Sequence, residues 1–306
     1  MIKLLPVNTM VSICMITYKH EAYIKQAIEG VLMQETTFEF DLIIADDCSP
    51  DKTFDVVNEI IKTHPNGFRI KYFRHDTNIG MQANGQFALE KCVGKYIALC
   101  EGDDYWTDPL KLQKQVDFLE VNPEFSFCCH RYQIYAEYDN KFDTEIYPLQ
   151  FIPYNYDLKG VVVDKTVFHS NWITQPLTSL LRRSALNKVD VRQFKYFRDV
   201  HLFYVLLIKD KGFCHEWIAG VYRKHEGGVH TGSNNADRRK DAFLIAEELY
   251  LFSKENEFIK MYLGNSIALL KDKKHLKILI KSFFVNLSIR DKYNMLKFTF
   301  QYFIRR

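Results

Sequence analysis

The chain has 306 residues, of which 47% are hydrophobic and 26% are charged, a composition that fits one large globular domain or one domain with an extension. No apolar run approaches the roughly 18 residues of a membrane-spanning helix, so we expect no transmembrane segment. The net charge of +3 is spread unevenly, because residues 254–306 carry twelve Lys or Arg against four Asp or Glu. This basic tail favours an acidic partner, such as lipid head groups, nucleic acid or an anionic glycan.

The seven cysteines and the N-terminus indicate the cellular setting. No two cysteines form CxxC, their number is odd, and several lie in apolar runs such as FSFCC. We interpret them as small buried hydrophobic residues in a reducing cytosol, not as disulfides or a zinc site. The first residues could be mistaken for a signal peptide, but they lack a small-residue cleavage site. A cytoplasmic protein is the expectation.

Strands and helices alternate over the first hundred residues. Apolar runs predict buried strands over residues 11–17, 40–47, 68–75 and 95–102. Between them lie predicted helices over 20–34, 49–65 and about 81–92. The inward face of the first helix consists of Ile24, Ala27, Ile28, Val31 and Leu32. The second helix is expected to begin with Ser49 as N-cap and Pro50 at its first position, and to bury Phe54, Val57, Ile60 and Ile61.

The rest of the chain is less regular. A helix after Asp108 and Pro109 is expected to bury Leu112, Val116 and Leu119. It is followed by a strand over 125–135, loops and short strands over 136–170, and a strand or turn with a short helix over 176–186. A helix over 197–212 is expected to bury Val200, Phe203, Tyr204 and Leu207, with Gly212 just past its end. A strand over 215–225, a Gly-rich loop and a helical region from about 236 to 306 complete the chain.

Polar groups gather where three of the predicted parallel strands end. These ends are Thr17 to Glu21, Asp46 with Asp47, and Glu101 to Asp104. The β-α-β-α-β-α-β order implies a parallel sheet covered by helices, and such sheets bind ligands at the carboxyl ends of their strands. We therefore expect these side chains to meet at one edge of the sheet.

The stretch EGDD, residues 101–104, is the main candidate for chemistry. Carboxylates at the end of a strand can bind Mg²⁺ or Mn²⁺, which prefer oxygen ligands and bridge to phosphates. The alternative is a solvated acidic turn. Of Asp46 and Asp47, one can accept hydrogen bonds from a nucleobase or ribose, while the other can be structural or support the following helix.

Two further candidates lie in the second half of the chain. Asp199 starts a helix and is either a capping acid or a functional one. The loop with Arg223, His225, Gly227 and Gly228 offers cations and close backbone approach to a phosphate. Four single residues are read as packing groups: His130, His169, His201 and Trp172.

At this point the motifs can be compared with a known family. VSICMITYKHEAYIKQAIEGVLMQ, LIIADDCSPDKT and GKYIALCEGDDYWTDPLKLQKQVDFLE, in this order and spacing, resemble the family 2 glycosyltransferases of the inverting, bacterial type with the GT-A fold. The resemblance is close from Val11 to about Val121. It continues more loosely through TSLLRRSAL, FRDVHLF and YRKHEGGV to about Val229.

The resemblance implies a fold and a domain division. The fold class is α/β: a GT-A, Rossmann-like, mainly parallel sheet flanked by helices, with a helical C-terminal extension. Residues 1–235 would be the catalytic domain, with a nucleotide-sugar-binding half over 1–121 and an acceptor-binding half over 122–235. Residues 236–306 would be the basic helical extension.

The resemblance also implies roles for individual residues. Tyr18, Glu21, Asp46 and Asp47 match positions around the nucleobase. EGDD matches the DxD-type motif, so that Asp103 would touch ribose or metal and Asp104 the metal, with Glu101 in place of the usual first Asp. Asp199 matches the catalytic base, with Arg198 in place of the usual Glu. His225 matches a diphosphate or metal contact. Asp47, Asp103, Asp104 and Asp199 are then expected around one pocket.

The reaction implied is transfer of a sugar from a nucleotide-diphosphate sugar, by default UDP-linked, to a hydroxyl of a glycan or lipid-linked acceptor. It would use Mn²⁺ or Mg²⁺ and Asp199 as base, in bacterial surface polysaccharide synthesis. Three alternatives are weighed. A nucleotidyltransferase would need a Gly-rich loop after the first strand, which TYKHEAY lacks. A Rossmann dehydrogenase would need GxGxxG there. A non-catalytic sugar-binding protein of the same fold would not need Asp103, Asp104 and Asp199, which are all present.

The basic tail supports two hypotheses. It can pack on the catalytic domain with a solvated basic face, or it can rest on an anionic membrane near a lipid-linked acceptor. The second hypothesis would make the protein peripheral on the inner face of the plasma membrane. We expect no nucleic-acid partner.

Overall fold

The computed structural model describes residues 9–149, 151, 159–171, 174–186, 189–228, 235–255, 257, 258, 261, 289 and 293. The chain forms two compact units. The first consists of Met1–Gln193 with Leu202–Lys224, and the second of Phe194–His201 with His225–Arg306. The domain boundary predicted at residue 235 stays a prediction.

The first unit is built on one mixed sheet with the strand order β3-β2-β1-β4-β9-β6-β10-β5, to which β7 and β8 add at the sides. The strands are β1 Val11–Thr17, β2 Phe40–Asp46, β3 Ile70–Arg74, β4 Tyr96–Leu99, β5 Tyr105–Trp106, β6 Phe125–Ala136, β7 Lys141–Phe142, β8 Gly160–Val163, β9 Leu180–Arg182 and β10 Lys211–Lys224. The α-helices are α1 Ile24–Leu32, α2 Thr53–Thr63, α3 Met81–Lys91, α4 Lys111–Val121, α5 Lys165–Asn171, α6 Arg183–Leu186, α7 Asp199–Leu206 and, in the second unit, α9 Asn235–Ser253. Short 3₁₀ turns lie at Gly67–Arg69, Pro176–Thr178 and Val191–Gln193.

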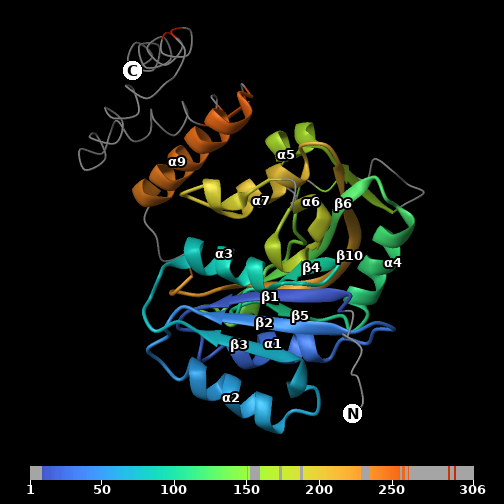
Figure 1. Cartoon of the computed structure of the whole chain (residues 1–306), viewed down its shortest axis with the longest axis vertical. Coiled ribbons are helices and arrows are strands. Elements are labelled where there is room, and N and C mark those ends of the chain that lie inside the picture. The colour runs from blue at the N-terminus through green and yellow to red at the C-terminus, as the bar shows by residue number, and fades with distance from the viewer. Residues whose placement is uncertain are drawn as a thin grey trace, which may run out of the picture. The chain divides into compact units, whose positions relative to one another are not determined.

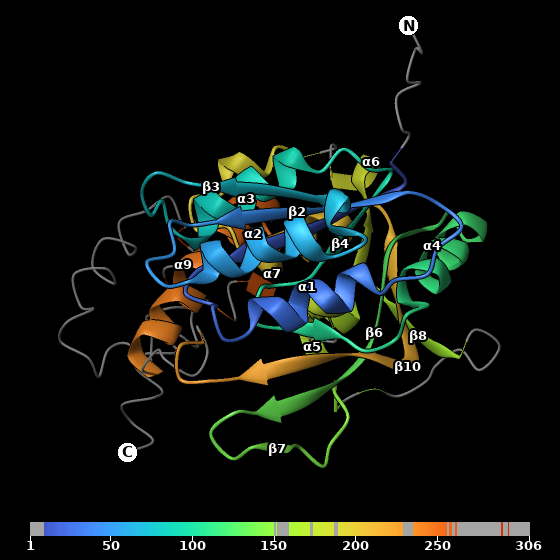
Figure 2. The same ribbon diagram turned by 90° about the horizontal axis from the view of Figure 1, so that it is seen from below.

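The first half of this sheet has the predicted parallel alternation. Strand β1 pairs in parallel with both β2 and β4, and β2 pairs in parallel with β3. Helices α1 and α2 lie on one face of these strands and α3 on the other (Figures 1 and 2). The strand order therefore reverses between β1 and β4, which is where an open α/β sheet binds ligands.

The second half of the sheet is mixed. Strand β9 runs antiparallel to β4 and β6, and β5 runs antiparallel to β10. The long strands β6 and β10 run parallel and side by side, with β7 beside the far end of β6 (Figure 2). Strand β10 thus carries residues of the Arg223 region to the edge of the sheet where β4 ends.

The predicted helix faces are mostly correct. All five inward residues of α1 are buried, as are Leu112, Val116 and Leu119 of α4. Helix α2 buries Val57 and Ile60, but the prediction for Phe54 is wrong, because its side chain is 45% exposed. Phe54 instead packs on the surface against the ring of Tyr72 and the guanidinium of Arg74.

Two predicted helix ends are also wrong. Helix α2 begins at Thr53 with Lys52 as N-cap, because Ser49 is taken by Asp46 of the preceding strand. The helix predicted over 197–212 ends at Leu206, and Gly212 lies in β10. Gly212 is required by close packing, because a Cβ there would overlap the ring of Phe127.

The second unit contains α9 and the segment Phe194–His201. Buried apolar residues of this unit are Phe194, Phe197, Phe243, Leu244, Ile245, Ala246, Leu249 and Phe258. The predicted helical C-terminal region is present as α9, whereas most of the basic tail lies outside the described residues. No helix among the described residues is long and apolar enough to cross a bilayer.

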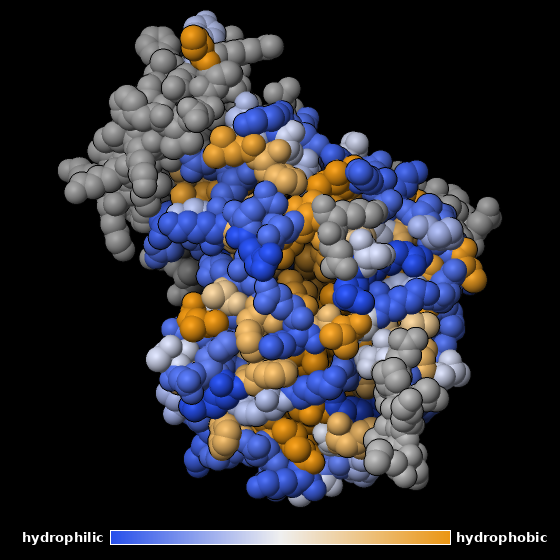
Figure 3. Space-filling model, viewed as in Figure 1, coloured by the Kyte–Doolittle hydropathy of each residue, from blue (hydrophilic) through white to orange (hydrophobic). Residues whose placement is uncertain are grey.

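Cysteines and surface agree with a packed globular chain. All seven cysteines are free thiols, and all but Cys48 are buried, as the sequence predicted. In the lower part of Figure 3, which holds the β1–β3 half of the sheet, hydrophilic residues surround small groups of apolar ones. Large exposed apolar side chains such as Phe68, Val93 and Val121 are far apart in the sequence.

Candidate active site

Hydrogen bonds join the loops that follow β1 and β2. The amide of Lys19 donates to Ser49 Oγ at 3.0 Å, and the amide of His20 donates to Thr53 Oγ1 at 3.1 Å. The amide of Asp47 donates to the carbonyl of Thr17 at 3.0 Å. The residues after β1 (17–20) and after β2 (47–53) therefore form one continuous surface, as the parallel pairing of the two strands predicted.

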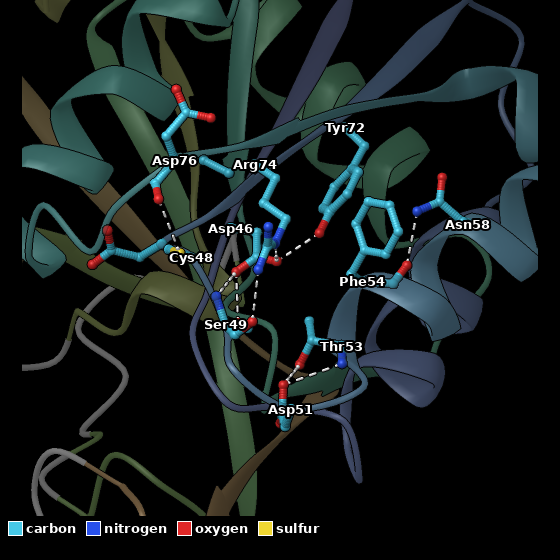
Figure 4. Close-up of polar contacts among 12 residues, drawn as sticks. Asp46, Cys48, Ser49, Asp51, Thr53, Phe54, Asn58, Tyr72, Arg74 and Asp76 are labelled. Atoms are coloured by element: carbon cyan, nitrogen blue, oxygen red, sulfur yellow. Dashed lines mark hydrogen bonds and ion pairs between the residues drawn. The ribbon is translucent and has the colours of Figure 1, made fainter.

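Asp46 lies beneath this surface and bonds to Ser49 in it. Its side chain has 0% exposure, and Oδ1 accepts hydrogen bonds from the amide and the hydroxyl of Ser49 at 2.9 and 2.6 Å. Oδ2 accepts from the hydroxyl of Tyr72 at 2.5 Å and lies 3.8 Å from Arg74 Nε (Figure 4). Burial and the Asp46 carboxylate raise the pKa of Tyr72. No atom of Asp46 is exposed, and the nucleotide contact predicted for Asp46 and Asp47 stays a prediction.

Asp47 connects the end of β2 to the start of α3. Its Oδ1 accepts the amide of Ile79 at 2.7 Å, and its Oδ2 accepts the amide of Gly80 at 2.9 Å. Gly80 has φ +89°, a conformation that favours glycine. Each carboxylate oxygen can accept two hydrogen bonds, so these contacts fix the direction of Asp47 and leave it acceptor capacity.

Glu21 and Tyr18 lie on the β1 loop. Glu21 Oε2 accepts the amide of Lys52 at 2.7 Å, and the amide of Glu21 donates to Asp51 Oδ2 at 3.0 Å. Burial tends to raise the pKa of Asp51, but hydrogen bonds from Thr53 and from the Glu21 amide bring it below its usual value. Glu21 thus supports the start of α2. Tyr18 is 38% exposed and is available to a flat ligand.

Glu101, Asp103 and Asp104 form a cluster of carboxylates after β4. One carboxylate oxygen from each lies within 4.8 Å of the others. Asp104 is almost fully buried, and its Oδ2 has no hydrogen-bond partner among the described residues. Burial and the charges of Asp103 and Glu101 raise the pKa of Asp104 well above its usual value. A buried, unpartnered oxygen beside two further carboxylates fits a hard divalent cation.

Gly102 allows this cluster to approach β1. Its amide donates to the carbonyl of Ile16 at 3.0 Å. A Cβ at Gly102 would lie 2.8 Å from Thr17 Oγ1 and 3.0 Å from His20 Nδ1. His20 Nε2 in turn lies 3.7 Å from Asp103 Oδ2. The ends of β1 and β4 are therefore in contact, at the point where the strand order reverses.

Arg223 of β10 holds Asp104 through its backbone. Its amide donates to Asp104 Oδ1 at 2.9 Å. The buried guanidinium donates to Glu137 and Gln26, and lies 4.8 and 5.1 Å from the ring centroids of Tyr23 and Tyr105. Arg223 thus ties the acidic cluster to α1 and β6.

Two tyrosines of β6 and β10 complete this part of the site. The rings of Tyr132 and Tyr222 lie 6.5 Å apart, and both are half-buried. Burial, followed by the charge of Asp104, raises the pKa of each phenol. Their hydroxyls make no hydrogen bond to the described residues, so they are available as donors to a hydroxyl-rich ligand.

Asp199 and His225 belong to the second unit. Asp199 is the first residue of α7, and its Oδ1 accepts the amide of Val200 at 3.0 Å. His225 is 4% exposed, and its carbonyl accepts the amide of Gly228 at 3.1 Å. The predicted single pocket with Asp47, Asp103, Asp104 and Asp199 stays a prediction.

The structure adds residues that the sequence reading did not single out. Gly102 was passed over within EGDD, although a glycine between acids signals close backbone approach. Arg223 had been considered only as a phosphate contact, whereas its side chain is internal. The positions of Tyr132 and Tyr222 depend on the pairing of β6 with β10, which no local pattern shows.

Comparison with known proteins shows which family the chain belongs to. The model of the family described as Glycosyl transferase family 2 matches residues 12–190, more than half of the chain. The chain belongs to glycosyl transferase family 2. The match contains the strand ends, the EGDD cluster and strand β9, and it confirms the resemblance drawn from the motifs.

Several proteins of known sequence resemble this family 2 chain over part of its length. An uncharacterised protein of Mycobacterium tuberculosis is 44% identical over 140 residues, which are 46% of this chain and 40% of that protein. A Bacillus subtilis glycosyltransferase named for teichuronic acid biosynthesis, TuaG, is 30% identical over 155 residues, 50% of this chain and 59% of TuaG. The chain thus matches less than two thirds of either relative's length.

Many solved structures share the fold. TarS of S. aureus, solved as residues 1–349 with UDP-GlcNAc, has a TM-score of 0.57 at 17% identity, covering 95% of this chain and 80% of TarS. The mannosyltransferase PcManGT of Pyrobaculum calidifontis, solved with GDP-Man and Mn²⁺, has a TM-score of 0.58 at 14% identity, covering 94% of this chain and 78% of PcManGT. The predicted GT-A fold is confirmed.

Proposed function

We propose that the chain transfers a sugar from a nucleotide-diphosphate sugar to a hydroxyl of a glycan or lipid-linked acceptor, with inversion at the anomeric carbon. The observation that carries this proposal is the cluster of Glu101, Asp103 and Asp104 at the reversal point of the sheet, with a buried, unpartnered oxygen on Asp104. Membership of glycosyl transferase family 2 supports the reaction class, and the carboxylate cluster supports the proposed position of the diphosphate and cation.

The donor is placed by the chain's own groups. Asp47, fixed by two amides, accepts a hydrogen bond from the nucleobase, and Tyr18 lies beside the base. Asp103 and Asp104 are the cation ligands, with Glu101 and His225 as further contacts to cation or diphosphate. A bound Mn²⁺ or Mg²⁺ would offset the charge that develops on the leaving diphosphate. The neighbour solved with GDP-Man and Mn²⁺ supports a divalent cation.

The transfer step needs one base. The acceptor oxygen attacks the anomeric carbon, its proton passes to Asp199, and the bond from that carbon to the diphosphate oxygen breaks, with the electron pair leaving on the nucleotide. One displacement inverts the configuration. This scheme uses a single carboxylate near the acceptor, unlike glycosidases, in which two carboxylates flank the bond.

The donor nucleotide is proposed to be UDP, for which the UDP-GlcNAc complex of TarS offers structural precedent. The setting is proposed to be bacterial surface polysaccharide synthesis, supported by the relationship to TuaG. Membrane contact through the basic tail stays a prediction, because most of that tail lies outside the described residues.

The test is a thermal-shift screen of the full chain against UDP-, GDP- and dTDP-sugars with Mn²⁺, followed by an assay of nucleotide release. We expect one nucleotide class to raise the melting temperature, and we expect Asp199→Asn to keep that shift while losing release. A nucleotide-sugar shift with unchanged release in Asp199→Asn would remove Asp199 from the mechanism. Absence of any shift would contradict the proposed donor class.

A further inference from the structure

Glu248 of α9 holds the segment that leads into Asp199. Its Oε1 accepts the amide of Lys195 at 2.8 Å, and its Oε2 accepts the amide of Tyr196 at 2.9 Å. Both amides precede α7, which begins at Asp199, so neither can be bonded inside that helix. Bonds from amides to an ionised carboxylate are stronger than neutral ones, so this contact fixes the backbone firmly.

His201 brings a second contact from the other side of Asp199. Its ring is fully buried, and Nδ1 accepts the amide of Arg198 at 3.2 Å. In a neutral imidazole the proton then lies on Nε2, which is 3.4 Å from Glu248 Oε2. This Nε2 does not meet hydrogen-bond geometry, so the contact with Glu248 is electrostatic.

Further contacts from α9 hold the same segment. Arg198 Nη2 lies 3.0 Å from Asp241 Oδ2. The ring of Phe194 lies 5.2 Å from that of Phe252, edge-to-face, and 4.7 Å from His201. Residues on both sides of Asp199 are thus held by one helix, α9.

We propose that Glu248 is a positioning residue for the base Asp199. By holding the amides of Lys195 and Tyr196 and facing His201, it sets the path of the backbone that presents the Asp199 carboxylate. A general base acts only within hydrogen-bond reach of its proton, and a shift of about 1 Å can cost 10²-fold in rate. This inference rests on the role proposed for Asp199.

The variant Glu248→Gln tests the proposal. Glutamine keeps one oxygen for one amide and turns an NH₂ group toward the other amide or toward His201 Nε2–H, so that two donors face each other. We expect kcat for nucleotide release, with water as the acceptor and the donor sugar that stabilises the wild type, to fall about 10- to 100-fold. KM for that donor should stay within about twofold, because the proposed donor contacts lie elsewhere.

Two further variants separate positioning from general stability. Glu248→Asp keeps two acceptor oxygens and the charge, and we expect it to recover part of the lost kcat. Glu257→Gln makes the same chemical change at an exposed glutamate of the same unit, and it should leave kcat, KM and melting temperature at wild-type values.

The outcomes distinguish this inference from the proposed function. Loss of release in both Asp199→Asn and Glu248→Gln, with unchanged donor KM in Glu248→Gln, supports both. Loss in Asp199→Asn alone overturns the role of Glu248 and leaves the proposed function intact. If Glu248→Gln loses donor binding and thermal stability together with kcat, and Glu248→Asp recovers nothing, its role is structural and the inference is wrong. Wild-type release in Asp199→Asn removes Asp199 from the mechanism and overturns this inference with it, whereas absence of any nucleotide-sugar shift in the wild type contradicts the proposed function itself.

Discussion

Replacing Asp104 by asparagine should make the metal-free protein more stable than the wild type and the metal-loaded protein less stable than the wild type. Asparagine has nearly the same shape and keeps an oxygen for the amide of Arg223, which Asp104 now binds at 2.9 Å. It removes one of three carboxylates whose oxygens lie within 4.8 Å of one another. The change therefore removes charge with little change in packing.

The expected change in stability can be worked out from the distance between the carboxylates. Two unit charges 4.8 Å apart repel by about 3.5 kcal/mol at an effective dielectric constant of about 20. Protonation of Asp104, whose pKa is raised by burial and by its neighbours, already relieves part of this repulsion. We therefore expect metal-free Asp104→Asn to be more stable than wild type by about 1–2 kcal/mol, or about 2–4 °C in melting temperature. At about 100 times its dissociation constant, a cation should stabilise the wild type by about 2.7 kcal/mol and the variant hardly at all.

Differential scanning fluorimetry in EDTA and in a series of Mn²⁺ concentrations measures both effects. Asp117→Asn, at an exposed position of α4, is the matched control and should behave as the wild type in both conditions. A metal-free Asp104→Asn that melts below the wild type, or that keeps the full Mn²⁺ shift, would refute the reasoning about this cluster.

Four other predictions concern Tyr222, Gly102, Lys111 and the basic tail. Tyr222→Phe should weaken binding of the nucleotide sugar severalfold while leaving binding of the free nucleotide unchanged in calorimetry, because the Tyr222 hydroxyl is available as a donor to a sugar hydroxyl; equal weakening of both would contradict that role. Gly102→Ala should lower both the melting temperature and the rise in melting temperature caused by Mn²⁺, because its Cβ would lie 2.8 Å from Thr17 Oγ1. Wild-type values of both would show that the Thr17 side chain can move aside. Burial lowers the pKa of Lys111 to about 7, so between about pH 7 and 10.5 the unfolded chain holds one proton more than the folded chain, and the free energy of unfolding should rise with pH. Lys111→Met should reduce this slope, measured by denaturant titration, by about 1 kcal/mol per pH unit. An unchanged slope would show that Lys111 is not neutral in the folded protein. Deleting the chain from about residue 270 should release the protein from anionic vesicles if the basic tail binds membrane, whereas an insoluble product would favour the packing hypothesis.

The sequence predicted best what depends on local pattern. Apolar runs located β1 and β2 almost to the residue, and helical spacing identified the buried face of α1, because these elements are buried along continuous surfaces. Chain order then implied that the ends of β1, β2 and β4 meet, which the hydrogen bonds from the Gly102 amide to Ile16 and from the Asp47 amide to Thr17 bear out.

The errors arose where tertiary contacts override local preference. Ser49 has the composition of an N-cap, but a buried carboxylate on the preceding strand uses its amide and hydroxyl. Phe54 fits the helical stripe, yet it packs on the surface with Tyr72 and Arg74. The first contact depends on Asp46 of β2 and the second on Tyr72 and Arg74 of β3, and the local pattern of α2 shows neither.

In the second half of the chain, local pattern predicted the strands that became β6 and β10 but not the contacts that they make. The contact between Asp104 and Arg223 joins residues 119 positions apart, and the bonds from Glu248 to Lys195 and Tyr196 join residues more than 50 positions apart. No periodicity carries such information. From the sequence alone, Glu248 in the middle of α9 would be predicted to face solvent, because its bonds to Lys195 and Tyr196 depend on the tertiary structure.

The central claim is that the acidic cluster binds a nucleotide diphosphate through a divalent cation. Isothermal titration of UDP, GDP and dTDP into the full chain, in Mn²⁺ and in EDTA, tests it most directly. We predict that one nucleotide binds at least about tenfold more tightly in Mn²⁺ than in EDTA, and that Asp104→Asn abolishes the difference. Nucleotide binding of equal strength with and without the cation, or no binding in either condition, would contradict it.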